Sequence, residues 1–235
     1  MNKLYLTYSL IYCKAIYRSE SMRKRMIGFP FILLLTFISL TNAVGGDITN
    51  IPTELYLFLT FFISTSTSSI LGQFLSFESS FYDLISTISK NIIKQLIITY
   101  YVFSLLLSLI QITVFSLLLP TGLKPIVFAS GIFFACTFPI INTILSLTKV
   151  DKFNIMASQY HQKQKSVIST ILITISMGVL LGINIFVCKS TGSLCIYILL
   201  GTAVTIMLSY LICFSKAIAK LFNNKRYSIR INFQK

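Results

Sequence analysis

The sequence has little charge, and acidic residues are the scarcest of all. Only 11% of its 235 residues are charged, with six Asp and Glu against 20 Lys and Arg, and the mean hydropathy is +0.82. A soluble domain carries about 25% charged residues, so this chain has too little charge to cover a surface exposed to water. Hydrophobic residues make up 55% of the chain and aromatic residues 14%, which excludes a disordered chain as well. We therefore expect an integral membrane protein.

Six apolar stretches contain no Asp, Glu, Lys, Arg or His. Each has roughly the 20 residues that a helix needs to cross a hydrocarbon core about 30 Å thick. The stretches are 26–44, 55–75, 95–119, 126–147, 167–187 and 194–214. The sequence thus predicts an all-α membrane protein with a six-span domain at 26–214, between an amphipathic, basic segment at 1–25 and a basic tail at 215–235. The first stretch could instead be the apolar core of a signal peptide, but the long basic segment before it favours an uncleaved span.

The basic residues predict the orientation of these spans, because Lys and Arg near span ends gather on the inner side of a membrane. With the N-terminus inside, 18 Lys and Arg fall on the inner side, and only Lys124 and Lys189 fall on the outer side. An even number of spans also keeps both basic tails inside. We therefore expect both termini in the cytoplasm. The net charge of +14 then faces membrane lipids, and no nucleic-acid partner is needed to explain it.

The apolar stretches also lack the residues that catalysis requires. An enzyme acting within a membrane needs a base, an activated nucleophile or metal ligands at depth, and the single histidine, His161, falls in a predicted loop. The cysteines show no metal-site spacing. Cys188 and Cys195 bracket the last outer turn, where a disulfide and two small residues at span ends are the alternatives. With no phosphate-binding G-x-x-x-x-G-K-[ST] loop either, we expect no catalytic residue, metal or cofactor in this chain.

Uncharged polar residues are what the spans offer instead. They fit packing, because Ser, Thr, Asn and Gln form hydrogen bonds between membrane helices that contribute about 0.6–2 kcal/mol each. The pair Gly178 and Gly182 also fits close helix packing, but such pairs are too common to decide the matter. The alternative is a weakly polar lining for a transport pathway. The candidates for such a lining are Ser66, Gln73, Gln111, Asn142 and Asn184.

Segment 76–94, between the second and third spans, is predicted to form an amphipathic helix on the inner membrane surface. Its apolar residues recur every three or four positions, which places them on one helix face. They are Phe77, Phe81, Leu84, Ile85, Ile88 and Ile92. Ser80 and Asp83 provide a start signal, and Lys90 with Lys94 favours the helix dipole at the other end. The helix is either a simple link between two spans or a docking element for a soluble partner.

Two regions carry a family resemblance. The run GQFLSFESSFYDL at 72–84, with YYVF at 100–103, resembles the region around the second span of ABC-2 type permeases from Bacteroidetes-like bacteria. Residues 149–164 resemble the inner loop between the fourth and fifth spans of that family. The similarity extends over residues 50–190.

The resemblance implies a six-helix permease half of an ATP-driven exporter in the bacterial inner membrane. Its implied partners are a second permease half and a separate ABC ATPase subunit, which holds the ATP and Mg²⁺. The helix after the second span would couple the two subunits through Phe77, Glu78, Phe81, Asp83, Leu84 and Ile88. The alternative function is a non-transporting membrane anchor or assembly factor that recruits a cytoplasmic partner through the same helix.

Overall fold

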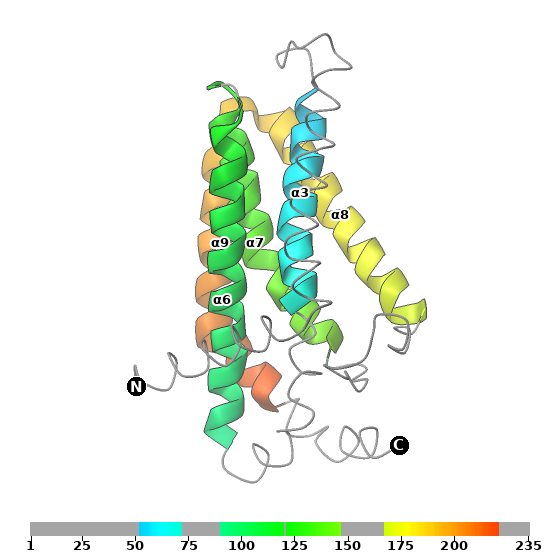
Figure 1. The fold of residues 1–235 in the computed structure, drawn as a ribbon, viewed down its shortest axis with the longest axis vertical. Helices are drawn as coiled ribbons and strands as arrows, with labels where there is room; N and C mark the ends of the chain where they lie inside the picture. Colours follow the sequence, from blue (N-terminus) through cyan, green and yellow to red (C-terminus); the bar gives the residue numbers. More distant parts are fainter. Residues whose placement is uncertain (1–51, 72–89, 120, 147–166, 221–235) are drawn as a thin grey trace.

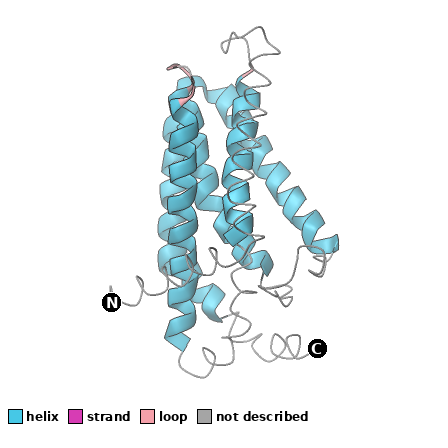
Figure 2. Cartoon of the chain, viewed as in Figure 1, coloured by secondary structure: helices cyan, strands magenta, loops and turns pink. Residues whose placement is uncertain are grey.

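A computed structural model of the chain describes residues 52–71, 90–119, 121–146 and 167–220. These residues are helical apart from Pro52 and the turn around 118–123, and they contain no strand (Figure 2). The α-helices are α3 (Thr53–Leu71), α6 (Lys90–Leu117), α7 (Lys124–Ser146), α8 (Val167–Thr191) and α9 (Cys195–Ser209). A 3-10 turn, η4 (Gly192–Leu194), joins α8 to α9, and a π-helical turn, η5 (Tyr210–Phe214), extends α9.

Three helical stretches are long and apolar enough to cross a membrane: Ile97–Leu117, Lys124–Ile144 and Thr174–Lys220. The third has 47 residues and runs through both α8 and α9, which turn η4 separates (Figure 1). Thr53–Thr65 in α3 is a shorter apolar helix. The prediction of an all-helical protein suited to a membrane is therefore confirmed for the described residues. The count of six spans and the inner position of both termini stay predictions, since the stretch 26–44 and both tails lie outside them.

Consecutive helices run in opposite directions, with α3, α7 and α9 descending and α6 and α8 rising in Figure 1. We call the end with Lys124 and Lys189 the upper end, and the end with Lys90 and Lys220 the lower end. The central helix is α7, because 67% of its apolar window is buried, against 39% in α6 and 22% in the α8–α9 stretch. Helices α3, α6 and α9 pack around it, whereas α8 leans away from the bundle toward the lower end (Figure 1).

Phenylalanine rings fill the contact between α3 and α7. The ring of Phe61 in α3 meets those of Phe134 and Phe138 in α7 edge to face, with ring centroids 5.4 and 5.3 Å apart. Phe134 and Phe138 stack on each other, one helical turn apart, at 5.4 Å. Leu199 and Ala203 of α9 belong to the same cluster. Aromatic pairs contribute about 0.5–1.5 kcal/mol beyond the area they bury, so this cluster ties three helices together.

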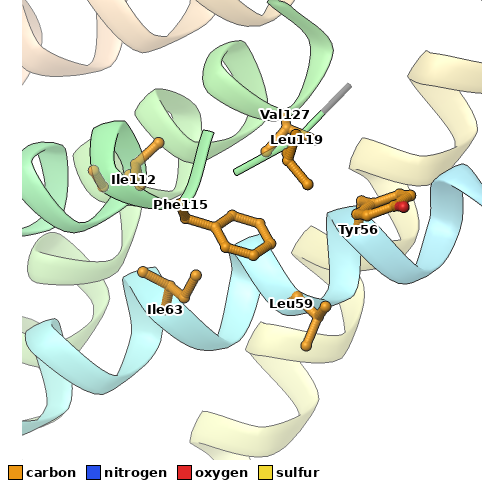
Figure 3. Close-up of a cluster of buried hydrophobic side chains, with 8 residues drawn as sticks. Tyr56, Leu59, Ile63, Ile112, Phe115, Leu119 and Val127 are labelled. Atoms are coloured by element: carbon orange, nitrogen blue, oxygen red, sulfur yellow. The ribbon is translucent and has the colours of Figure 1, made fainter. Parts of the chain in front are cut away.

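A second cluster joins α3, α6 and the upper part of α7 (Figure 3). Tyr56, Leu59 and Ile63 follow one another at spacings of three and four residues, which places them on one face of α3. They pack with Ile112 and Phe115 of α6. The same α3 helix thus contacts both its neighbours through adjacent faces.

The helix ends differ from the predicted ones at two places. Helix α6 includes Lys90 and Lys94, so it extends beyond the predicted start of the third span at 95. No Gly or Pro interrupts the chain between Lys90 and the apolar span, which allows the helix to include the lysines. Most of segment 76–94 lies outside the described residues, so the surface helix stays a prediction. Helix α8 continues beyond 187 to Thr191, where Gly192 ends it with a φ of +54°, the left-handed conformation common at a helix C-terminus.

Gly131 allows α6 and α7 to approach each other closely. A Cβ atom at this position would lie 2.6 Å from Cγ2 of Ile112, which is fully buried and cannot move aside. We expect Gly131→Ala to be less stable than Gly182→Ala by about 1–3 kcal/mol because of overpacking. Gly182 is the matched control, since a Cβ there meets no atom within 4 Å and both changes alter helix propensity alike. Reversible unfolding in detergent micelles measures the difference, and equal stabilities would contradict the close approach.

Candidate functional site

Charged side chains in the described residues lie only near helix ends. Glu54, Lys124 and Lys189 are at the upper end. The residues at the lower end are Lys90, Lys94, Lys216 and Lys220. Within these described segments no group of three or more His, Cys, Asp or Glu comes together as metal ligands. Any recognition inside this part of the bundle therefore relies on uncharged hydrogen-bonding groups.

Asn184 is the polar side chain that attaches α8 to α7. The hydroxyl of Ser130 donates to Oδ1 of Asn184 at 3.2 Å, and both side chains are fully buried. The thiol of Cys188, one turn further along α8, lies 3.9 Å from the same oxygen. Among the described residues, Nδ2 of Asn184 has no hydrogen-bond partner. An unpaired buried donor costs about 1–3 kcal/mol. Packing against apolar side chains alone would therefore not favour an amide at this position.

The described candidates for a pathway lining lie at two levels. Asn184 is level with Ser130, whereas Asn142 lies about 18 Å further along α7, at 1.5 Å per residue. Asn142 is buried and adjoins Thr143, whose hydroxyl donates to the carbonyl of Pro139 at 2.6 Å. Gln111 is half-buried and directly precedes Ile112, which lies against Gly131. Gln111 therefore lies at about the same height in the bundle as Ser130. Their role as a lining stays a prediction.

The structure does not describe the side chains of the other predicted site residues. Ser66 lies in α3, in a part of the helix whose side chains are not described, and Gln73 lies outside the described residues. The same holds for the whole set predicted to contact an ATPase: Phe77, Glu78, Phe81, Asp83, Leu84 and Ile88. Their coupling role stays a prediction.

A buried tyrosine pair connects three helices in a way that the sequence analysis did not foresee. The rings of Tyr101 in α6 and Tyr210 stack with centroids 4.2 Å apart, and both are at most 1% exposed. The hydroxyl of Tyr101 donates to the carbonyl of Cys136 in α7 at 3.1 Å. Tyr210 begins the π-helical turn η5, a distortion that often marks functional sites. The available signal was a tyrosine within the last predicted span, since the hydroxyl of a buried tyrosine usually needs a partner.

An ion pair closes the upper end between α3 and α8. Nζ of Lys189 lies 2.8 Å from Oε1 of Glu54. The hydrogen bond from Lys189, helped by its positive charge, lowers the pKa of Glu54 below the ordinary value of 4.5. The side chains are 66% and 40% exposed, so solvent screens the pair and its main effect is to align the two helix ends.

A double-mutant cycle tests the contact between Ser130 and Asn184. We expect Ser130→Ala and Asn184→Ala to show a coupling free energy of about 0.6–2 kcal/mol, since each removes the same interhelical hydrogen bond. The control cycle pairs Ser130→Ala with Thr202→Ala, because the Thr202 hydroxyl bonds within its own helix, to the carbonyl of Leu199. Unfolding in micelles measures both cycles. Additive effects at Ser130 and Asn184 would show that the hydrogen bond does not form.

The ion pair predicts a pH dependence of stability. Because the folded-state pKa of Glu54 is depressed, the pair stabilises the fold fully above pH 4.5 and loses this effect as the pH falls through the folded-state value. We expect the stability difference between wild type and Lys189→Gln to shrink as the pH drops below 4.5. Lys124→Gln removes a charge at the same end and should show no such change. A pH-independent difference for Lys189→Gln, measured by thermal unfolding, would argue against the pair.

Comparison of the chain with protein families, with curated proteins and with solved structures finds no match. The resemblance to ABC-2 type permeases therefore rests on the sequence runs at 72–84, 100–103 and 149–164. Of these, only 100–103 lies within the described residues, where it forms part of α6.

Proposed function

We propose that this chain is the membrane-spanning permease subunit of an ATP-driven, ABC-2 type exporter in the bacterial inner membrane. The observation that carries the proposal is the bundle of apolar helices with an uncharged interior and charges gathered at its two ends. With no charged group in its described interior to relay protons, such a bundle would need a partner's energy to move a solute or a lipid-like molecule against a gradient. A separate ABC ATPase subunit, holding ATP and Mg²⁺, is the partner that the sequence resemblance implies.

The positions of the helix ends support an inner location for the coupling segment. Helix α3 ends at Leu71 and α6 begins at Lys90, both at the lower end of the bundle (Figure 1). Lys216 and Lys220 lie at this end too, and four lysines there against two at the upper end favour the lower end as the cytoplasmic one. The segment between α3 and α6, with Phe77, Phe81 and Asp83, would then face an ATPase.

The filled interior favours a pathway between two permease halves. Phe61, Phe134 and Phe138 pack ring against ring where α3 meets α7, and the Tyr101–Tyr210 stack fills the contact between α6 and η5. Opening a passage through these contacts would break the packing that holds the helices together. We infer that the substrate crosses at the seam with a second half, so that the helices tilt as units.

The alternative is a non-transporting membrane anchor or assembly factor that recruits a cytoplasmic partner through segment 76–94. The same filled interior is compatible with this function, because an anchor needs no pathway. The two functions differ in whether the substrate changes ATP turnover.

Co-purification of the full chain with an ATPase subunit tests the proposal. We expect a phosphate-loop ATPase to accompany the wild type in mild detergent. We expect Phe81→Asp and Asp83→Lys to reduce that association at least about tenfold, equivalent to about 1.4 kcal/mol. Ser190→Asp, an exposed change in the last turn of α8 at the opposite end, is the control that should keep the partner.

Three outcomes separate the candidates. Substrate-stimulated ATP turnover in proteoliposomes, lost in both coupling variants, supports the exporter. Association without any such stimulation indicates the anchor. If both variants retain association and ATP-driven export, the coupling assignment is wrong. Unchanged thermal stability of the variants excludes misfolding as the cause of a loss.

A further inference from the structure

We propose that Cys188 and Cys195 form a dithiol–disulfide site at the upper end of the bundle. Cys188 lies in the last turn of α8, and Cys195 is the first residue of α9. Turn η4 reverses the chain between them, with Gly192 in the left-handed conformation. The backbone N–H of Cys195 donates to the carbonyl of Gly192, which fixes the start of α9 against the turn. The fold thus brings the two cysteines together.

The thiols contact each other and share a polar environment. Cys188 lies within interaction distance of the side chains of Cys195 and Ser130. Sγ of Cys188 lies 3.9 Å from Oδ1 of Asn184. Both cysteines are free in this structure, so it represents the dithiol form.

The two thiols differ in exposure, which assigns their order of reaction. Cys188 is half-buried, whereas Cys195 is only 1% exposed. A disulfide reagent from solution therefore meets Cys188 first. Lys189 follows Cys188 directly and is paired with Glu54, so charge at this position neither attracts nor repels the reagent strongly.

The oxidant that the site requires is an external disulfide. The thiolate of Cys188 attacks one sulfur of that disulfide, which forms a mixed disulfide and releases one thiolate. The thiolate of Cys195 then attacks the sulfur of Cys188 and releases the second thiolate. Two cysteine thiols are oxidised to one disulfide, and the external disulfide is reduced to two thiols, which take up the two protons that the cysteines lose. The product ties the end of α8 to the start of α9.

Mass spectrometry of the full-length protein tests this site, since Lys189 lies between the two cysteines. Trypsin cuts after Lys189 and separates peptide 166–189, with Cys188, from peptide 190–216, with Cys195. Purified protein is reduced, oxidised with glutathione disulfide at about pH 8, and then denatured, alkylated and digested. Peptide 190–216 also contains Cys213, so the experiment uses Cys213→Ala. We expect the two peptides to be joined, and reduction to separate them.

The matched control moves the first thiol by one position around α8. In the background of Cys213→Ala, the variant Val187→Cys with Cys188→Ala places the sulfur about 100° away around the helix. We expect at least about tenfold less linked peptide in this variant, because disulfide geometry is specific. Linkage only in the protein with Cys188 supports the site, and alkylated Cys136 shows that oxidation was selective. Absent linkage, or equal linkage in both proteins, overturns it. Equal elution of both proteins in size-exclusion chromatography confirms that both are folded.

Discussion

The packing of α7 against its neighbours is the constraint on which the rest of the structure depends. In a bilayer the lipid is as apolar as the protein, so helices associate through close contact and hydrogen bonds, and burial of apolar surface adds little. Gly131 brings α6 close on one side, and Phe134 with Phe138 receives Phe61 on another. Helix α9 joins the same cluster through Leu199. Each of the other helices is positioned by α7, which explains why it is the most buried.

Helix α8 is held differently, and this sets it apart from the other helices. Its polar and ionic contacts to other elements include three in its upper half: Asn184 to Ser130, Lys189 to Glu54, and the turn with Cys188 and Cys195. Further down, Ile171, Ile175 and Val179 are half exposed or more. Among the described residues, the contacts of α8 with its neighbours therefore include polar and ionic ones at the upper end, and its lower half exposes aliphatic side chains.

The sequence was sufficient to locate the helices but not to orient them. Charge-free runs identify spans because a charged side chain at depth is costly, and α3, α6, α7, α8 and α9 overlap five of the predicted stretches. Hydropathy does not tell which face is buried, since exposed Ile175 and buried Ile112 are equally apolar. The Ser130–Asn184 bond joins positions 54 residues apart, and the stack of Tyr101 on Tyr210 spans an even longer separation. Such pairs depend on how each helix is oriented about its own axis, which no local sequence pattern determines.

The uncharged interior has a further consequence if the proposed coupling holds. Energy from a partner must then enter at a helix end, and the segment between α3 and α6 is attached to the lower ends of both helices. Both helices contact α7 through the cluster of Tyr56, Ile63 and Phe115 near its upper part (Figure 3). A displacement at the lower ends of α3 and α6 would therefore tilt these helices about their upper contacts, among them the close contact of Gly131 with Ile112. Close-packed contacts of this kind resist deformation, so the helices would tilt as rigid rods and open the seam to a second half.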